Sequence, residues 1–331
     1  MKHARSNPTV LTYGLAVWVV AACLVVGGEA AALSGIATRA LCNELPKAPS
    51  DTSAAPAARE AGDAAFALRA DAAQADAAIV AYGRSLAADP SQVDVRVRLS
   101  RLHYLLGDGR FRFAEKDEAQ LAAFEQGMRH AATALATVNP AFRSRICSGA
   151  SLDDAMAVLD RSSVAPLYWF ATHLGKYGLA KDLLEVLANK DMIFRAMSRI
   201  RELDAGYFYS APDRYLGAYW TKVPFPAGDL PRALAHFQVS MRGERGYFAT
   251  YVLVAELYVL KAKANVTKDA RFCRLDSAAG GQGGACKRLY AVLLEHVIKA
   301  KNTLPEIEAE QAVEREKARL LLEELDTYFP S

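Results

Sequence analysis

Apolar residues recur every three to four positions over most of this chain, the spacing that places them on one face of a helix. In residues 62–88, two such runs follow one another, and Ala78 and Tyr82 lie one turn apart on the inner face of the second. Asp89-Pro90 then closes the pair. Strict alternation of polar and apolar residues does not extend over any useful length. We therefore expect an all-α protein.

The remaining helical runs are separated by Pro, Gly and Asn signals. They are predicted at residues 93–106, 118–138, 152–160, 165–177, 192–203, 213–220, 229–237, 247–262, 287–299 and 305–325. Gly107-Asp108-Gly109 is interpreted as part of an enlarged turn, and the last helix has Glu, Arg and Lys positions suited to an exposed terminal cap. Pro90 and Pro140 lie further apart than the tetratricopeptide period of about 34 residues. The prediction is an irregular tetratricopeptide-like array of helical hairpins.

The clearest hairpin consists of two helices joined by a Pro/Gly connector near residue 225. Gly217 and Ala233 are small enough to let these helices approach closely, and we expect Leu216, Trp220 and Phe237 to fill the seam around them. This pattern predicts packing and by itself indicates no activity.

The N-terminus predicts the compartment. Lys2, His3 and Arg5 precede a charge-free stretch over residues 6–28 that is strongly apolar at its centre, as in an export signal or a membrane anchor. Val20-Ala21-Ala22-Cys23 has the form of a bacterial lipobox, so Cys23 is a candidate for lipid modification. The apolar run continues past Cys23, which fits an uncleaved transmembrane anchor, and ordinary cleaved secretion is a third interpretation. All three place the body of the protein outside the cytoplasm.

Three regions follow from these patterns. Residues 1–28 are predicted to be a signal peptide or membrane anchor, and residues 29–60 a short helix and a linker rich in Pro, Ala and Ser. Residues 61–331 are predicted to form the tetratricopeptide-like helical domain.

The other cysteines are compatible with export. Cys273 and Cys286 flank a Gly-rich stretch, and a disulfide between them would restrain a loop that cannot fold by itself, although two unpaired thiols are the alternative. Nothing in the sequence decides whether Cys42 and Cys147 pair.

Composition and charge exclude several classes of function. The formal charge is +3, and it falls to +1 without Lys2 and Arg5 of the leader, so a nucleic-acid surface is not expected. The histidines do not form a metal-ligand pair at helix-face spacing, and the sequence contains neither a P-loop nor a nucleophile elbow. We expect no enzyme, no metal and no cofactor.

A resemblance to a known family becomes specific in the second half of the chain. Five segments carry it in order: residues 167–171 (Leu-Tyr-Trp-Phe-Ala), 202–209 (Glu-Leu-Asp-Ala-Gly-Tyr-Phe-Tyr), 215–219 (Tyr-Leu-Gly-Ala-Tyr), 224–229 (Pro-Phe-Pro-Ala-Gly-Asp) and 233–237 (Ala-Leu-Ala-His-Phe). This order resembles the TatT family, the lipoprotein T components of tetratricopeptide-repeat-associated TRAP transporters. Residues 209–213 stand where that family carries a Gly-Gly-Pro-His-like turn.

The resemblance implies a periplasmic helical body that is tethered to a membrane and crossed by a pore or cleft. In the family this body associates with the substrate-binding P component of an ion-gradient-driven transporter, and trimers are known.

Aromatic residues crowd the connectors of this region, and a passage for small apolar or amphiphilic acids needs apolar walls with a few placed polar groups. The candidate lining residues are Tyr168, Trp169, Tyr207, Tyr209, Tyr215, Tyr219, Trp220 and Phe225. Arg195 or Arg214 would receive a carboxylate through a bidentate contact. The alternatives are that the aromatic residues form the core of the repeats and that the arginines are solvated or ion-paired.

The sequence is compatible with three hypotheses about the function, each from a different class. A solute-handling accessory of a TRAP transporter predicts an apolar channel through the body. A general scaffold for protein partners at the cell envelope predicts a filled interior with an exposed groove, and a hydrolase predicts a nucleophile beside a base.

Overall fold

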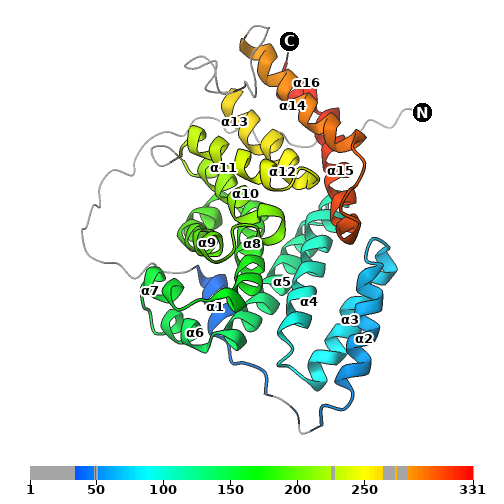
Figure 1. Cartoon of the computed structure of the whole chain (residues 1–331), viewed down its shortest axis with the longest axis vertical. Coiled ribbons are helices and arrows are strands. Elements are labelled where there is room, and N and C mark those ends of the chain that lie inside the picture. The colour runs from blue at the N-terminus through cyan, green and yellow to red at the C-terminus, as the bar shows by residue number, and fades with distance from the viewer. Residues whose placement is uncertain are drawn as a thin grey trace.

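The computed structural model describes residues 34–47, 49, 51–224, 228–263, 273 and 282–330. Within these ranges every regular element is helical and no strand occurs, which confirms the all-α prediction (Figure 1). The predicted lipidation site Cys23, the predicted leader and the candidate Phe225 lie outside the described residues.

The helices follow one another with short connections. The first half contains α1 (Gly35–Cys42), α2 (Ala55–Ala67), α3 (Ala72–Ala88), α4 (Val93–Leu105), the π-helix η1 (Leu106–Phe111), α5 (Asp117–Val138), α6 (Pro140–Cys147), α7 (Leu152–Ala157), the 3-10 turn η2 (Arg161–Ser163) and α8 (Val164–Lys181). The second half contains α9 (Leu183–Leu203), α10 (Tyr207–Lys222), α11 (Leu230–Gly243), α12 (Phe248–Leu253), the π-helix η3 (Val254–Val259), α13 (Leu260–Lys263), α14 (Gln282–Lys299), the 3-10 turn η5 (Pro305–Ile307), α15 (Glu308–Glu323) and α16 (Leu325–Tyr328).

Consecutive helices pack as hairpins, most extensively α2 with α3, α4 with α5, α8 with α9 and α10 with α11 (Figure 1). This arrangement is consistent with a tetratricopeptide-like array. Helix α8 is central, because it packs against α4, α5 and α9. Its three consecutive aromatic residues, Tyr168, Trp169 and Phe170, point in different directions around the helix, yet all three are buried because neighbours surround it.

The seam between α10 and α11 is built on a glycine. A Cβ atom added to Gly217 would lie 2.8 Å from Cγ of Phe237, so the absence of a side chain lets the two helices approach. Ala233 and Phe237 are fully buried in the cluster that Trp220 also packs against. Leu216, which we expected in the same seam, packs instead into the cluster around α8, because it lies about 100° around the helix from Gly217.

A substitution tests this seam. We expect Gly217→Ala to lower the free energy of unfolding by about 1–3 kcal/mol, because the methyl group meets the Phe237 ring in a filled core. The matched control is Gly83→Ala in α3, where an added Cβ meets no atom within 4 Å and the glycine is exposed. The control should raise stability by about 0.5–1 kcal/mol through helix propensity. Chemical denaturation measures both, and equal effects would show that the close approach is unimportant.

The expected turn at residues 107–109 is wrong. The chain continues through it as the π-helix η1, and its glycines serve close packing. A Cβ on Gly107 would lie 2.6 Å from the Phe124 ring, and a Cβ on Gly109 would lie 2.7 Å from Val313. The Gly-Asp-Gly sequence resembles a turn because glycine marks both turns and close helix contacts.

The interpretation of α15 as an exposed cap also needs correction. Glu310, Glu314 and Lys317 are 4–5% exposed and lie on one buried face of α15, whereas Arg319 and Glu323 lie outside. Glu310 receives the guanidinium groups of Arg69 on the N-terminal hairpin and Arg101 on α4, with N···O distances of 2.8 and 2.6 Å. These partners are more than 200 residues away in the chain, so the local sequence cannot show that the charges are compensated.

The N-terminal region is attached to the body by a disulfide between Cys42 on α1 and Cys147 on α6. Helix α2 begins at Ala55, inside the stretch predicted as a linker. No helix in the described part of the chain has the length and apolar character needed to span a membrane.

Candidate functional site

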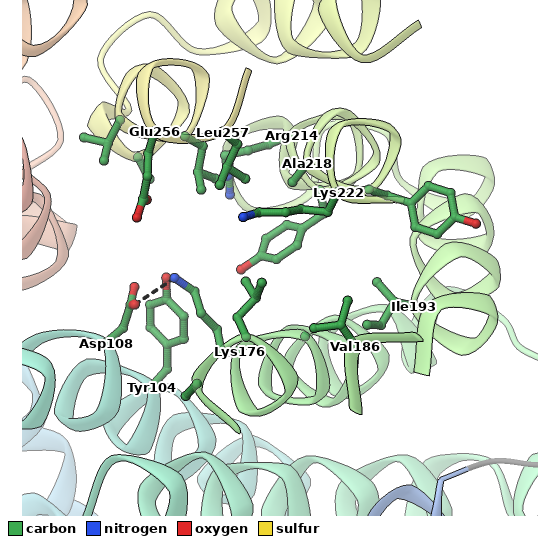
Figure 2. Close-up of a pocket in the computed structure, with 18 of the residues that line it drawn as sticks. Tyr104, Asp108, Lys176, Val186, Ile193, Arg214, Ala218, Lys222, Glu256 and Leu257 are labelled. Atoms are coloured by element: carbon green, nitrogen blue, oxygen red, sulfur yellow. Dashed lines mark hydrogen bonds and ion pairs between the residues drawn. The ribbon is translucent and has the colours of Figure 1, made fainter. Parts of the chain in front are cut away.

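A cavity of about 360 Å³ lies between the two halves of the helical body. Its walls come from α4, η1 and α5 on one side, α8 and α9 below, and α10, α12, η3 and α15 on the other sides (Figure 2). This volume is within the range of small-molecule sites. The side chains that line it are strongly charged at one end and apolar at the other.

The charged end centres on Asp108, which is 2% exposed. The Lys176 ammonium group lies 2.7 Å from one oxygen of its carboxylate, and Lys317 donates to the other oxygen. Lys317 also lies 2.8 Å from Glu314. Burial by itself would raise the pKa of Asp108, but the two ammonium groups hold it well below the usual range. The carboxylate is therefore ionised in the folded protein.

The two π-helices bring further charges to this end. Asp108 lies on η1 and Glu256 lies on η3, which faces it across the cavity (Figure 2). Arg112 bridges them, at 3.1 Å from Glu256 and 3.7 Å from Asp108. Burial tends to raise the pKa of Glu256, but the guanidinium of Arg112 reverses this and lowers it. Single-turn π segments occur often at functional sites, and both π segments here supply acids to one cavity.

Arg214 is the most unusual group in the wall. Its side chain is 1% exposed, its Nη1 donates to the carbonyl oxygen of Tyr209 at 2.9 Å, and its Nη2 donates to that of Phe208 at 3.3 Å. The guanidinium also stacks over the Tyr247 ring at 4.3 Å. No described carboxylate forms an ion pair with it. A buried cation is expensive unless an anion compensates it.

The carbonyl groups that hold Arg214 come from a strained turn. Phe208, Tyr209 and Ser210 have φ values of 42°, 60° and 55°, which is the left-handed region that residues with a Cβ rarely adopt. Such strain persists only where the surroundings enforce it, and it concentrates at functional sites. Tyr209 and Ser210 belong to residues 209–213, which by the resemblance stand where the TatT family carries a glycine-containing turn, and glycine adopts that conformation freely.

The opposite end of the cavity is apolar and open. Val186 and Ile193 from α9 line it, on the far side from Asp108 (Figure 2). Leu179 lies at its edge and is 51% exposed, and Lys222 extends into the cavity from α10. Further exposed leucines follow at the start of α9, where Leu183 and Leu184 are 55% and 77% exposed.

Three of the predicted lining residues, Arg214, Tyr215 and Tyr219, line the cavity. Tyr168 and Trp169 lie behind the wall in the core, where the Tyr168 ring contacts the Tyr215 ring edge-to-face at 5.7 Å. The expected apolar walls are therefore present at one end only, and charges dominate the other.

The other predicted residues are not among those lining the cavity. The ring of Tyr207 packs against that of Tyr168, with centroids 5.3 Å apart, and Tyr209 stacks on Tyr247 and donates its hydroxyl to Glu306 at 2.6 Å. The Trp220 ring lies under the Arg232 guanidinium at 4.0 Å.

Arg195, the second candidate for a carboxylate contact, forms a surface ion pair with Asp153 at 2.8 Å. Cys273 and Cys286, which were candidates for pairing, form a disulfide.

Sequence reasoning missed most of the charged end. Asp108 was hidden in an apparent turn, and Glu314 and Lys317 were assigned to an exposed cap. The useful signal was Gly107 and Gly109 on both sides of an acid, because glycines that permit close packing imply that the acid between them is buried.

The sequence also did not show that three histidines, two half-buried and one fully buried, lie near one another inside the helical body. His103 and His130 stack with ring centroids 5.6 Å apart, and His173 Nε2 donates to the carbonyl oxygen of Ser100 at 2.9 Å. Burial lowers the pKa of His103 to about 4 and that of His130 and His173 to about 3. No group of three or more His, Cys, Asp or Glu side chains in the described ranges is placed to hold a metal ion.

These features define an all-helical hairpin array that encloses a cavity of small-molecule size, charged at one end and apolar at the other. Residues 112–269 match the model of the TAtT family, TRAP transporter T-component. The matched segment runs from the end of η1 to beyond α13 and contains most of the cavity wall. The resemblance inferred from the sequence is thereby confirmed over this segment. A search among curated proteins finds no match.

Proposed function

We propose that this protein is a non-enzymatic T component that holds or passes a small apolar or organic-acid solute in concert with a TRAP-type solute-binding protein. The cavity is the observation that supports this role most directly, because it combines a volume of about 360 Å³ with an apolar edge that is open to solvent. The family match supports the association with a TRAP transporter.

We further propose that the protein works at the periplasmic face of a membrane, tethered by lipidated Cys23 or by an uncleaved N-terminal helix. The two disulfides, Cys42 to Cys147 and Cys273 to Cys286, support an oxidising compartment outside the cytoplasm. A trimer, as implied by the resemblance, is part of this proposal.

We propose that the partner binds a leucine cluster beside the cavity, formed by Leu179, Leu183 and Leu184. These side chains are more than half exposed within six residues of one another, whereas most exposed apolar side chains are scattered. A partner docked there would cover the open end of the cavity, so that solute passes without entering the solvent.

The test uses the purified protein and the TRAP-type solute-binding protein of the same organism. We expect a complex in size-exclusion chromatography, and we expect Leu183→Asp with Leu184→Asp to weaken it at least tenfold. The matched control is Val292→Asp, at a position 57% exposed on α14, which should leave the complex unchanged. If no complex forms, a general scaffold for other envelope proteins is the better assignment.

A further inference from the structure

The charges around the cavity do not balance. Six cationic residues line it, Arg112, Lys176, Lys190, Arg214, Lys222 and Lys317, against three acidic residues, Asp108, Glu256 and Glu314. All three acids are already bound by Arg112, Lys176 or Lys317. Lys190 pairs with Asp191 outside the cavity at 2.8 Å. Two cations, Arg214 and Lys222, therefore have no ion-pair partner among the described residues.

Arg214 retains hydrogen-bonding capacity. A guanidinium has five N–H donors, and the two hydrogen bonds of Arg214 go to carbonyl oxygens, so donors remain for a ligand. The carbonyl contacts and the stacking on Tyr247 hold the guanidinium in place, so that little entropy is lost when it binds a ligand. Lys222 extends from the same helix, two turns further along, toward the same space (Figure 2).

The apolar end determines what the rest of the ligand can be. Val186 and Ile193 line this part of the wall (Figure 2), whereas the three acids that line the cavity are paired with Arg112, Lys176 and Lys317 at the other end. A charged or strongly hydrated group would lose its water there without compensation. At about 30 Å³ for each heavy atom, the cavity holds roughly a dozen heavy atoms.

We propose that the cavity binds a monoanionic amphiphile of about a dozen heavy atoms, with its acid group on Arg214 and Lys222 and its apolar chain along the α8 and α9 wall toward the open edge. This inference rests on the proposed function and specifies its solute. The acid enters first, because both unpaired cations lie between Ile193 and the charged end at Asp108 (Figure 2). The ion-paired cluster around Asp108 closes the inner end, and its three cations are already paired with acids, so it offers no unpaired cation to a second negative charge on the ligand.

The test is isothermal titration calorimetry of the full chain with three probes of equal chain length: decanoate, decanol and decylamine. We expect decanoate to bind at least tenfold more tightly than decanol and decylamine not to bind. Affinity should rise about fourfold for each methylene from hexanoate to decanoate, because each added methylene is buried. Equal affinity for decanoate and decanol, or no binding of decanoate, would overturn the inference.

Two variants test which residues of the protein bind the acid group of the ligand. Lys222→Met lies at an accessible position and should weaken decanoate binding about fivefold while leaving decanol unchanged. Arg214→Lys should weaken decanoate by more than tenfold, with circular dichroism to verify the fold, since Arg214 is buried. If neither variant in its folded form changes decanoate binding, the assignment of these residues is wrong.

Complex formation with the solute-binding protein is measured separately. A complex without decanoate binding overturns only this inference, whereas loss of the complex overturns the proposed function.

Discussion

Glu310→Gln is expected to lower the free energy of unfolding by about 3–5 kcal/mol, although it changes a single carboxylate to an amide. Glu310 is 4% exposed and is the only described acid that pairs with both Arg69 and Arg101. Removing one partner from a buried ion cluster leaves the remaining charges without compensation, which costs far more than the cluster contributes as a whole. Although burial by itself raises the pKa of Glu310, the two guanidinium groups lower it, so the carboxylate is ionised at neutral pH.

The control for this prediction replaces the whole cluster. Arg69→Met, Arg101→Met and Glu310→Leu together should return the stability to within about 1 kcal/mol of the natural protein, because apolar residues of similar volume need no counter-charge. Urea denaturation compares the variants. A Glu310→Gln protein as stable as the natural one would show that α15 is not held to the N-terminal hairpin by this charge cluster.

The second large effect is a loss of stability in mild acid. His103, His130 and His173 have pKa values lowered by burial to about 4, 3 and 3 in the folded protein, against about 6.5 when unfolded. A lowered histidine pKa means that the unfolded chain takes up protons first. The stability is therefore fully present above pH 6.5 and is lost as the pH falls from there toward 4.

The size of the stability loss follows from the number of protons that the unfolded chain takes up. Each histidine contributes about 1.4 kcal/mol per pH unit in this window, so three of them give a slope of about 4 kcal/mol per pH unit. Below pH 4 the carboxylates of Asp108, Glu256 and Glu310 add to the loss, because neighbouring cations lower their pKa values although desolvation raises them. Urea denaturation at pH 7, 6 and 5 measures the slope.

A histidine variant separates this cause from general acid effects. His130→Phe keeps the ring that stacks on His103 and removes one titrating group, so the slope should fall by about one third. His296→Phe, at an exposed position, should not change it. Constant stability from pH 7 to 5.5 would show that the buried histidines do not control the acid response.

The sequence predicted the helices well because their apolar spacing is local information. The ends of α3 and α5 fall at Asp89-Pro90 and Asn139-Pro140 as expected, since proline cannot continue a helix. Local information failed where a residue's environment is set by distant elements. The π-helix η1 has the composition of a turn, and nothing near Glu310 or Lys317 in the chain indicates that Arg69 or Asp108 will neutralise them.

The residues of the candidate site were likewise predictable from the sequence only in part. Arg214, Tyr215 and Tyr219 lie on α10, which carries part of the family resemblance, and the structure brings them to the cavity. Arg195 is chemically equivalent to Arg214 in the sequence, yet it lies on the outer side of α9 beside Asp153. Only the packing of the helices distinguishes the two arginines, because a helix face is fixed by its neighbours.

Transfer of solute from the partner into the cavity tests the central claim most directly. The solute-binding protein, loaded with its own solute, is mixed with this protein, and native mass spectrometry then records which chain carries the solute. We predict that the natural chain acquires the solute mass and that Ala218→Trp, which fills the cavity from α10, does not, although it still binds the partner. Solute that remains entirely on the partner, or that reaches both forms equally, would contradict the proposal that this cavity is where the solute is held.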